Sequence, residues 1–129
     1  SSDMLGEARQ ALLLQRVRYG SGGITAREVL SIATEGGAGL LGFEEAGRIE
    51  EGRLADLSLF DVTKMEYAGA MSDPIAALVF SGYDHGADHV MVNGRFVVRN
   101  RRLVGADEEE IRREADKASR RLLAKAGIE

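Results

Sequence analysis

The stretch Gly47-Arg48-Ile49-Glu50-Glu51-Gly52-Arg53-Leu54-Ala55-Asp56-Leu57-Ser58-Leu59-Phe60-Asp61 decides how this sequence is interpreted. Two glycines five residues apart bracket a short polar turn, and Leu57 and Leu59 then alternate with Asp56 and Ser58. Period-two alternation bounded by glycine is typical of a strand with one buried face. We therefore expect a strand that ends at Asp61, with both leucines facing a core.

Length and composition indicate one folded unit. The chain has 129 residues, of which 44% are hydrophobic and 29% charged, a balance typical of globular proteins. Its net charge of −4 gives no bulk attraction to nucleic acid or to an anionic membrane, and no apolar run approaches the roughly 20 residues of a membrane span. Cysteine is absent, which excludes disulfides and thiolate metal sites. We therefore expect a cytoplasmic protein that binds neither nucleic acid nor membranes.

Helical patterns stand on both sides of the strand. Residues 3–19 and 25–40 precede it, and Thr25 with Glu28 predicts a capping box. Glycines at 36, 37 and 39 each cost about 1 kcal/mol of helix propensity relative to alanine. Either the helix breaks near Gly36 or these small residues allow close packing, and we favour a close approach to a neighbouring element. Residues 75–80 predict a short helical turn, and residues 107–125 a last helix capped by Asp107. The expected inward-facing residues are Leu5, Ala8, Leu12, Val29, Ile32, Ala33, Leu40, Ile111, Ala115, Ala118, Leu122 and Ala126.

Residues 88–98 predict a β-hairpin. Valines alternate with Met91, and Asn93-Gly94 is a strong signal for a two-residue turn. A second turn at Asn100 leads to a third short strand at residues 103–104. The sequence therefore predicts a mixed α and β unit.

Two histidines are the first candidates for chemistry. His85 and His89 lie four residues apart, a spacing that binds metal when both lie on one helix, and Asp84 and Asp88 precede them. Glycines around this segment argue against a helix. A loop metal site is therefore the alternative, and we favour two solvent-facing histidines before a strand.

Other polar residues define no mechanism by themselves. Asp56 has no partner base, nucleophile or metal ligand, and we expect it to accept hydrogen bonds from backbone amides around Gly52. Ser1 and Ser2 have no local base, and Gly20-Ser21-Gly22-Gly23 lacks the lysine of a phosphate loop. The strand region is basic but lacks the aromatics of a single-stranded nucleic acid surface, which favours a solvated sheet face. Its arginines are Arg48, Arg53, Arg95, Arg99, Arg101 and Arg102.

Four segments, in order, resemble the C-terminal part of the amidohydrolase superfamily. They are Thr34–Gly42, Gly47–Leu57, Asp73-Pro74 with Leu78-Val79, and Val90–Val98. The opening segment, Ser1–Gln15, is similar to the branch that contains triazine hydrolases and 8-oxoguanine deaminase. Arg101 departs from the family, which usually has glycine there, and this puts the geometry of the second turn in question.

The resemblance implies an α/β fold: the C-terminal part of a metal-dependent hydrolase TIM barrel with most of a small β-sandwich. Residues 1–46 would be the last barrel helices, residues 47–104 the sandwich, and residues 105–129 a terminal helix. The family's metal ligands lie before Ser1, so the resemblance implies no catalytic, cofactor-binding or metal residue in this chain. Asp3 lies beyond the ligand position, and residues 1–7 would lie near the pocket mouth.

The implied activity belongs to a longer parent enzyme. One zinc or iron ion would make water nucleophilic, and the water would hydrolyse a non-peptide carbon–nitrogen bond, in the deamination of a heteroaromatic ring such as a purine or triazine. The expected partners are the N-terminal barrel part of the same enzyme, a small heteroaromatic substrate and further copies in a homo-oligomer. We expect this segment alone to be inactive, and to be marginally stable, to dimerise or to remain joined to the parent.

Two alternatives stay open. One is a stand-alone, non-catalytic β-plus-helix module for binding or oligomerisation, and the other is a different amidohydrolase branch, such as a cyclic-amide hydrolase or a deacetylase.

The first residue is Ser1 rather than methionine, and a helical pattern follows almost at once. We interpret this start as a cut end, with a trimmed tag as the alternative.

Overall fold

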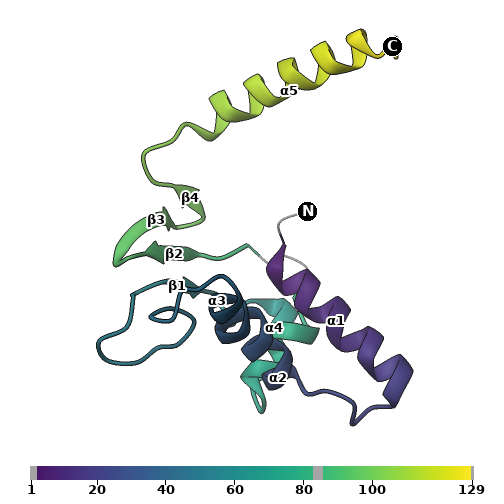
Figure 1. Cartoon of the computed structure of the whole chain (residues 1–129), viewed down its shortest axis with the longest axis vertical. Helices are drawn as coiled ribbons and strands as arrows, with labels where there is room; N and C mark the ends of the chain where they lie inside the picture. The colour runs from purple at the N-terminus through teal and green to yellow at the C-terminus, as the bar shows by residue number, and fades with distance from the viewer. Residues whose placement is uncertain (1–2, 83–85, 129) are drawn as a thin grey trace.

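The computed structural model describes residues 3–82 and 86–128 and shows a helical cluster, a small sheet and a projecting helix (Figure 1). The helical elements are α1 (Met4–Tyr19), α2 (Ala26–Ser31), the π-helical turn η1 (Ile32–Gly36), α3 (Gly37–Leu40), the 3-10 turn η2 (Met65–Tyr67), α4 (Pro74–Phe80) and α5 (Glu108–Lys125). The strands are β1 (Leu57–Leu59), β2 (His89–Val92), β3 (Arg95–Arg99) and β4 (Arg102–Leu103).

The core lies where α1, α2 and α4 meet. Leu12 of α1 and Val79 of α4 are fully buried, and Val29 of α2 joins them. Alanines at positions 8 and 26 complete this cluster and allow the helices to approach closely. The predicted inward positions Leu5, Ala8, Leu12 and Val29 are confirmed.

Side-chain caps fix where the helices begin. The Thr25–Glu28 capping box is confirmed, since Thr25 Oγ1 accepts from the Glu28 N–H and Glu28 accepts from the Thr25 N–H. Asp3 caps α1 by accepting from the Gly6 N–H at 2.8 Å, and Asp73 caps α4 by accepting from the Ala76 N–H at 3.0 Å. The helix at residues 75–80 is thus a capped helix rather than a single turn.

The glycine-rich helix departs from the prediction. Residues 26–40 stay helical, but η1 inserts a π turn that rotates the following residues relative to α2. The expected close approach to a neighbouring element is wrong for Gly39, where an added Cβ would meet nothing within 4 Å, but the helix does approach the loop at Gly47 closely through Glu35 and Ala38. Ile32 and Leu40 are also wrong as inward residues, being 61% and 88% exposed. The close approach belongs to Gly47, whose added Cβ would lie 2.8 Å from the Cα of Glu35.

The four strands form one antiparallel sheet in the order β1-β2-β3-β4. The hairpin of β2 and β3 is confirmed, with Asn93 (φ 48°) and Gly94 (φ 75°) in left-handed conformations that the two-residue turn requires. Arg101 is also left-handed (φ 63°) in the β3–β4 turn, so this turn forms without the family's glycine. The predicted buried face of β1 is wrong in part, because β1 lies at the sheet edge and Leu59 is 46% exposed.

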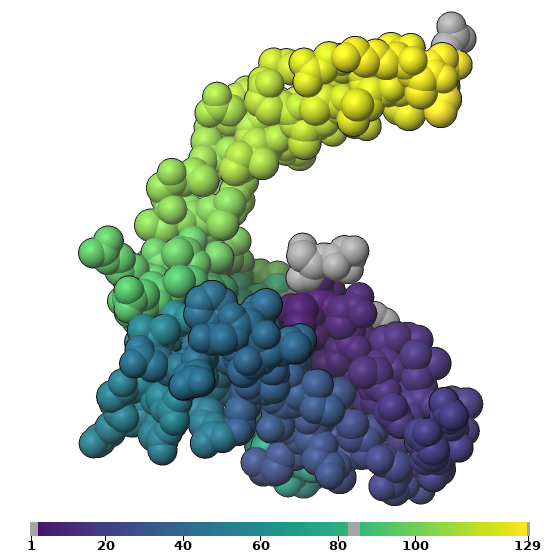
Figure 2. Space-filling view, in the orientation of Figure 1, coloured from purple at the N-terminus to yellow at the C-terminus, as the bar shows by residue number. Residues whose placement is uncertain are grey.

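Helix α5 begins after Asp107, as predicted, and extends away from the sheet and the helical cluster (Figures 1 and 2). None of its described residues is buried, so its predicted stripe contacts no core in this structure.

The fold is mixed α/β with a four-stranded antiparallel sheet, as expected in outline. The division at residues 46 and 104 stays a prediction. Across residues 3–82 and 86–128, no helix has the length and apolarity needed to cross a bilayer.

Candidate functional site

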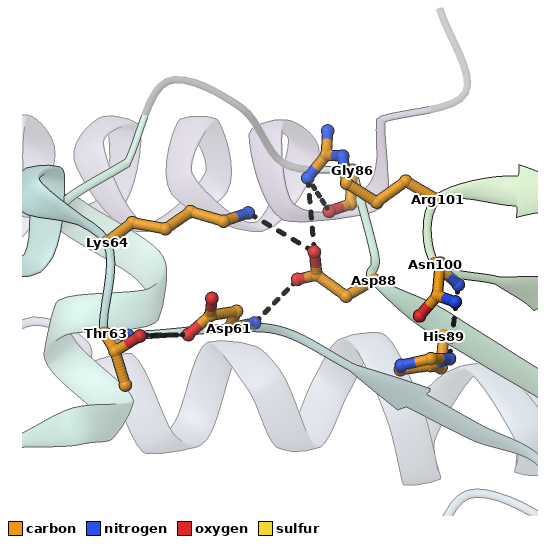
Figure 3. Close-up of polar contacts among 8 residues, drawn as sticks. All are labelled: Asp61, Thr63, Lys64, Gly86, Asp88, His89, Asn100 and Arg101. Atoms are coloured by element: carbon orange, nitrogen blue, oxygen red, sulfur yellow. Dashed lines mark hydrogen bonds and ion pairs between the residues drawn. The ribbon is translucent and has the colours of Figure 1, made fainter.

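Asp88, directly before β2, is the centre of a polar cluster at one end of the sheet, where β1 ends and β2 begins (Figure 3). Its Oδ2 accepts from the Asp61 N–H at 2.7 Å, and its Oδ1 lies 3.5 Å from Lys64 Nζ and 3.6 Å from an Arg101 guanidinium nitrogen. Its backbone N–H donates to the Leu59 carbonyl, and its carbonyl accepts from the Arg101 N–H. One residue thus joins the end of β1, the start of β2 and the β3–β4 turn.

The electrostatics of this cluster favour charged carboxylates. The Asp61 N–H lowers the pKa of Asp88 below its ordinary value, burial opposes the shift, and the Lys64 and Arg101 charges add to it. The hydroxyl and backbone N–H of Thr63 likewise lower the pKa of Asp61. An acidic pKa below the usual range suits a hydrogen-bond acceptor rather than a general acid at neutral pH. The cluster therefore holds loops together.

His89 takes part in local contacts. Its Nδ1 accepts from the Asn100 N–H at 3.4 Å, and its ring meets Phe96 edge-on at 5.9 Å. His85, its predicted partner in the alternative metal site, lies outside the described residues with Asp84, as do Ser1 and Ser2. Across the part of the chain that the structure describes, no three His, Cys, Asp or Glu side chains group closely enough to hold a metal. The described residues therefore do not fit a metal ion, and the alternative site around His85 stays a prediction.

Asp56 contacts a backbone amide, but not the one predicted. Its Oδ1 accepts from the Asn93 N–H at 2.6 Å, while the Gly94 N–H donates to the Ala55 carbonyl at 3.0 Å. The expectation of hydrogen bonds around Gly52 is wrong, because the chain reverses so that the hairpin turn, rather than the preceding glycine turn, lies beside Asp56. Asp56 therefore fixes the hairpin.

Arg9 was not predicted and makes the longest-range side-chain contacts of the helical cluster. Its Nε donates to the Val79 carbonyl at 2.7 Å, and one terminal nitrogen donates to the carbonyls of Ser81 (2.9 Å) and Gly82 (3.0 Å). A cation at the C-terminal end of α4 also complements the helix dipole. The only sequence signal is an arginine next to Ala8 on the buried side of a helix.

Several arginines of the basic sheet region contact acidic or aromatic side chains. Arg48 bonds Glu35 and Arg53 bonds Glu50, while the Arg99 guanidinium lies 4.4 Å from the centre of the Phe96 ring. These contacts are those of a solvated surface.

An apolar hollow of about 430 Å³ separates the helical cluster from β1. Met4 and Leu5 of α1 contribute to one wall and Leu57 and Phe60 to another. The described part of the segment that we expected at a pocket mouth, residues 1–7, thus borders a hollow. That hollow contains no cluster of metal-binding side chains.

Comparison with known proteins places these features in a family. The family model described as "Amidohydrolase family" matches residues 1–97. An 8-oxoguanine deaminase from Pseudomonas aeruginosa is 43% identical over 107 residues, which are 83% of this chain and 23% of the relative. The chain therefore spans about a quarter of the length of this relative.

Two solved structures share the arrangement of the elements. Atrazine chlorohydrolase from Arthrobacter aurescens, solved with zinc, is 35% identical with a TM-score of 0.82 over 88% of this chain and 25% of that one. An adenosine deaminase from Xanthomonas campestris with bound zinc is 28% identical with a TM-score of 0.88 over 94% of this chain and 28% of that one. The resemblance inferred from the sequence is confirmed, and the chain belongs to the amidohydrolase family.

Proposed function

We propose that this chain is the C-terminal segment of a metal-dependent amidohydrolase that removes an amino group from a heteroaromatic ring, a purine or a triazine. The supporting observation is the 43% identity to an 8-oxoguanine deaminase across 83% of the chain. The similarity to an adenosine deaminase, at a TM-score of 0.88, favours a purine. The N-terminal barrel part of the same polypeptide would be its partner.

In this proposal the chain supplies the last barrel helices, most of a small β-sandwich and the terminal helix. Helices α1 and α2 would close the barrel, and β1 to β4 would belong to the sandwich. Helix α4 follows β1 in sequence yet packs into the core of α1 and α2. It would therefore join the two parts rigidly.

The chain's own residues support rather than react. Asp3 is occupied as the cap of α1, with its Oδ1 2.8 Å from the Gly6 nitrogen. A Cβ at Gly6 would lie 2.5 Å from Asp3 Oδ2, so glycine is what lets the carboxylate approach. Because the described residues do not fit a metal ion, no step of hydrolysis is assigned to them.

The test is ammonia release by the polypeptide as its source makes it, purified with its zinc content measured. We expect release from at least one aminopurine or aminotriazine, and none from residues 1–129 alone. A zinc-loaded natural polypeptide that deaminates neither ring class would contradict the proposal.

A matched variant checks the role of Asp3. Asp3→Asn keeps an oxygen for the Gly6 N–H but removes the negative charge that a metal ligand supplies. We expect unchanged zinc content. Loss of zinc would show that Asp3 binds the metal.

A second candidate is a stand-alone binding or oligomerisation module without catalysis. The observation that favours it is the lack of a metal-binding group among residues 3–82 and 86–128. It predicts a natural polypeptide of about this length that contains no stoichiometric metal.

A further inference from the structure

Helix α5 carries an apolar face that no described residue covers. The helix extends away from the sheet and the helical cluster (Figures 1 and 2), and within this chain Ile111 and Leu122 are 52% and 66% exposed. Ala115 and Ala118 lie between them on the same side, because steps of four, three and four residues stay on one face of a helix. An exposed apolar face of this kind indicates a protein partner.

The charges of α5 divide between its two halves. Residues 107–116 hold six acidic and two basic side chains, and residues 117–125 hold four basic and no acidic ones. The helix dipole accounts for charges in the first and last turns only, so it does not explain Arg120 and Arg121. Neither arginine forms an ion pair with any residue that the structure describes, whereas Lys117 pairs with Glu114.

We propose that α5 pairs with α5 of a second copy of this chain, in antiparallel orientation. A two-fold axis that passes between Asp116 and Lys117 brings Ile111 of one copy level with Leu122 of the other. The same axis brings Ala115 level with Ala118, since both pairs are equidistant from it. Apolar residues thus meet apolar residues at these four central positions, and the alanines allow the two helices to approach closely.

The flanking charges agree with the same axis. Glu114 and Arg121 are seven residues, or about two turns, apart and therefore lie on the same side of the seam. In the antiparallel pair, Glu114 of one copy and Arg121 of the other are offset by only about 3 Å along the helix axis. A parallel pair would instead place the acidic first turns side by side, which is repulsive.

A second copy is the partner that this surface fits, because the surface is complementary to itself. A two-fold interface requires that every patch find its complement on the same surface. The acidic half of α5 meets the basic half, and the apolar centre meets itself. The 18-residue helix is about 27 Å long, so the interface is small and we expect a weak, concentration-dependent dimer.

The first test is a charge exchange, followed by sedimentation equilibrium of the polypeptide as its source makes it. Glu114→Arg and Arg121→Glu should each weaken dimerisation about tenfold, because two symmetric attractions become repulsions. The double variant Glu114→Arg/Arg121→Glu restores both opposite-charge pairs and should return the dimerisation constant to near wild type. Single variants without effect, or a double variant as weak as the singles, would overturn the proposal.

The second test is a zero-length carbodiimide cross-link between Glu108 and Lys125 in a mixture of ¹⁴N and ¹⁵N protein. Within one helix these residues are 17 positions, or about 25 Å, apart, so the link can form only between antiparallel copies. The Glu108 carboxylate accepts from the Leu103 N–H through one oxygen and keeps the other free to react. We expect mixed-isotope peptides. Their absence would mean that another part of the polypeptide covers α5. Neither test depends on deaminase activity.

Discussion

Asp56 Oδ1 accepts a 2.6 Å hydrogen bond from the backbone N–H of Asn93, a residue 37 positions further along the chain. Next to it, the Gly94 N–H donates to the Ala55 carbonyl at 3.0 Å. Two consecutive residues before β1 thus bind both residues of the β2–β3 turn. This contact joins two of the sequence segments that carry the family resemblance and gives them a shared structural role.

Replacement of Asp56 tests this contact. Asp56→Ala removes the acceptor of the Asn93 N–H and should lower the free energy of unfolding by about 1 kcal/mol. Asp56→Asn keeps an acceptor oxygen and should lose less than half as much. Urea unfolding measures the loss, and amide exchange at Asn93 localises it. Equal effects of both substitutions would show that the charge, rather than the hydrogen bond, matters.

Gly47 and Gly52 form a matched pair for the approach of the loop to the glycine-rich helix. Both have left-handed φ values, 84° and 81°, but an added Cβ meets Glu35 and Ala38 at 2.8 and 3.0 Å only at Gly47. Gly52→Ala should cost about 1 kcal/mol from conformation alone, and Gly47→Ala about 3 kcal/mol because backbone must also move. Thermal unfolding of both variants measures the two losses of stability. Equal costs would mean that the close approach is not formed in solution.

The Arg9 clamp predicts a difference between arginine and lysine. Arg9→Ala should lower the free energy of unfolding by about 2 kcal/mol, since three backbone carbonyls lose a charged donor. Arg9→Lys keeps the charge but lacks the planar fork that reaches all three carbonyls. We expect it to recover less than half of the loss in urea unfolding. If Arg9→Lys were as stable as the wild type, the positive charge alone, rather than the planar guanidinium, would account for the stabilisation.

The lowered pKa of Asp88 predicts that the contacts at this end of the sheet weaken in acid. The Asp88 pKa is lowered in the folded state, so the unfolded chain binds the proton more readily. The contribution to stability is therefore complete above the ordinary Asp pKa of 3.8, and it is lost as the pH falls through the lower folded-state pKa. Free energies of unfolding measured from pH 6 to pH 2 should fall less steeply below pH 4 for Asp88→Asn. Identical slopes for the two proteins would exclude this role.

Local features were predictable from the sequence because neighbouring residues determine them. The Thr25–Glu28 capping box and the Asn93-Gly94 turn each depend on residues within four positions, and both form as expected. The cap at Asp107 follows the same rule. These features set the ends of the elements and the register of the hairpin.

Contacts between distant segments had no such signal. Arg9 meets Val79 across 70 positions, and no periodic pattern marks an arginine whose partners are backbone carbonyls. The interpretation of Leu40 failed for a different reason. Its spacing fits an α-helix, but the π turn at residues 32–36 changes the phase of the helix. Residues before and after that turn therefore no longer lie on the same face.

The intact mass of the natural polypeptide, isolated from its source with an antibody to this segment, tests most directly whether these residues belong to a longer enzyme. If the proposed function is right, the chain is longer than these 129 residues by roughly 250 residues or more, the size of a barrel domain. A natural product of about 129 residues would contradict it and leave the stand-alone module.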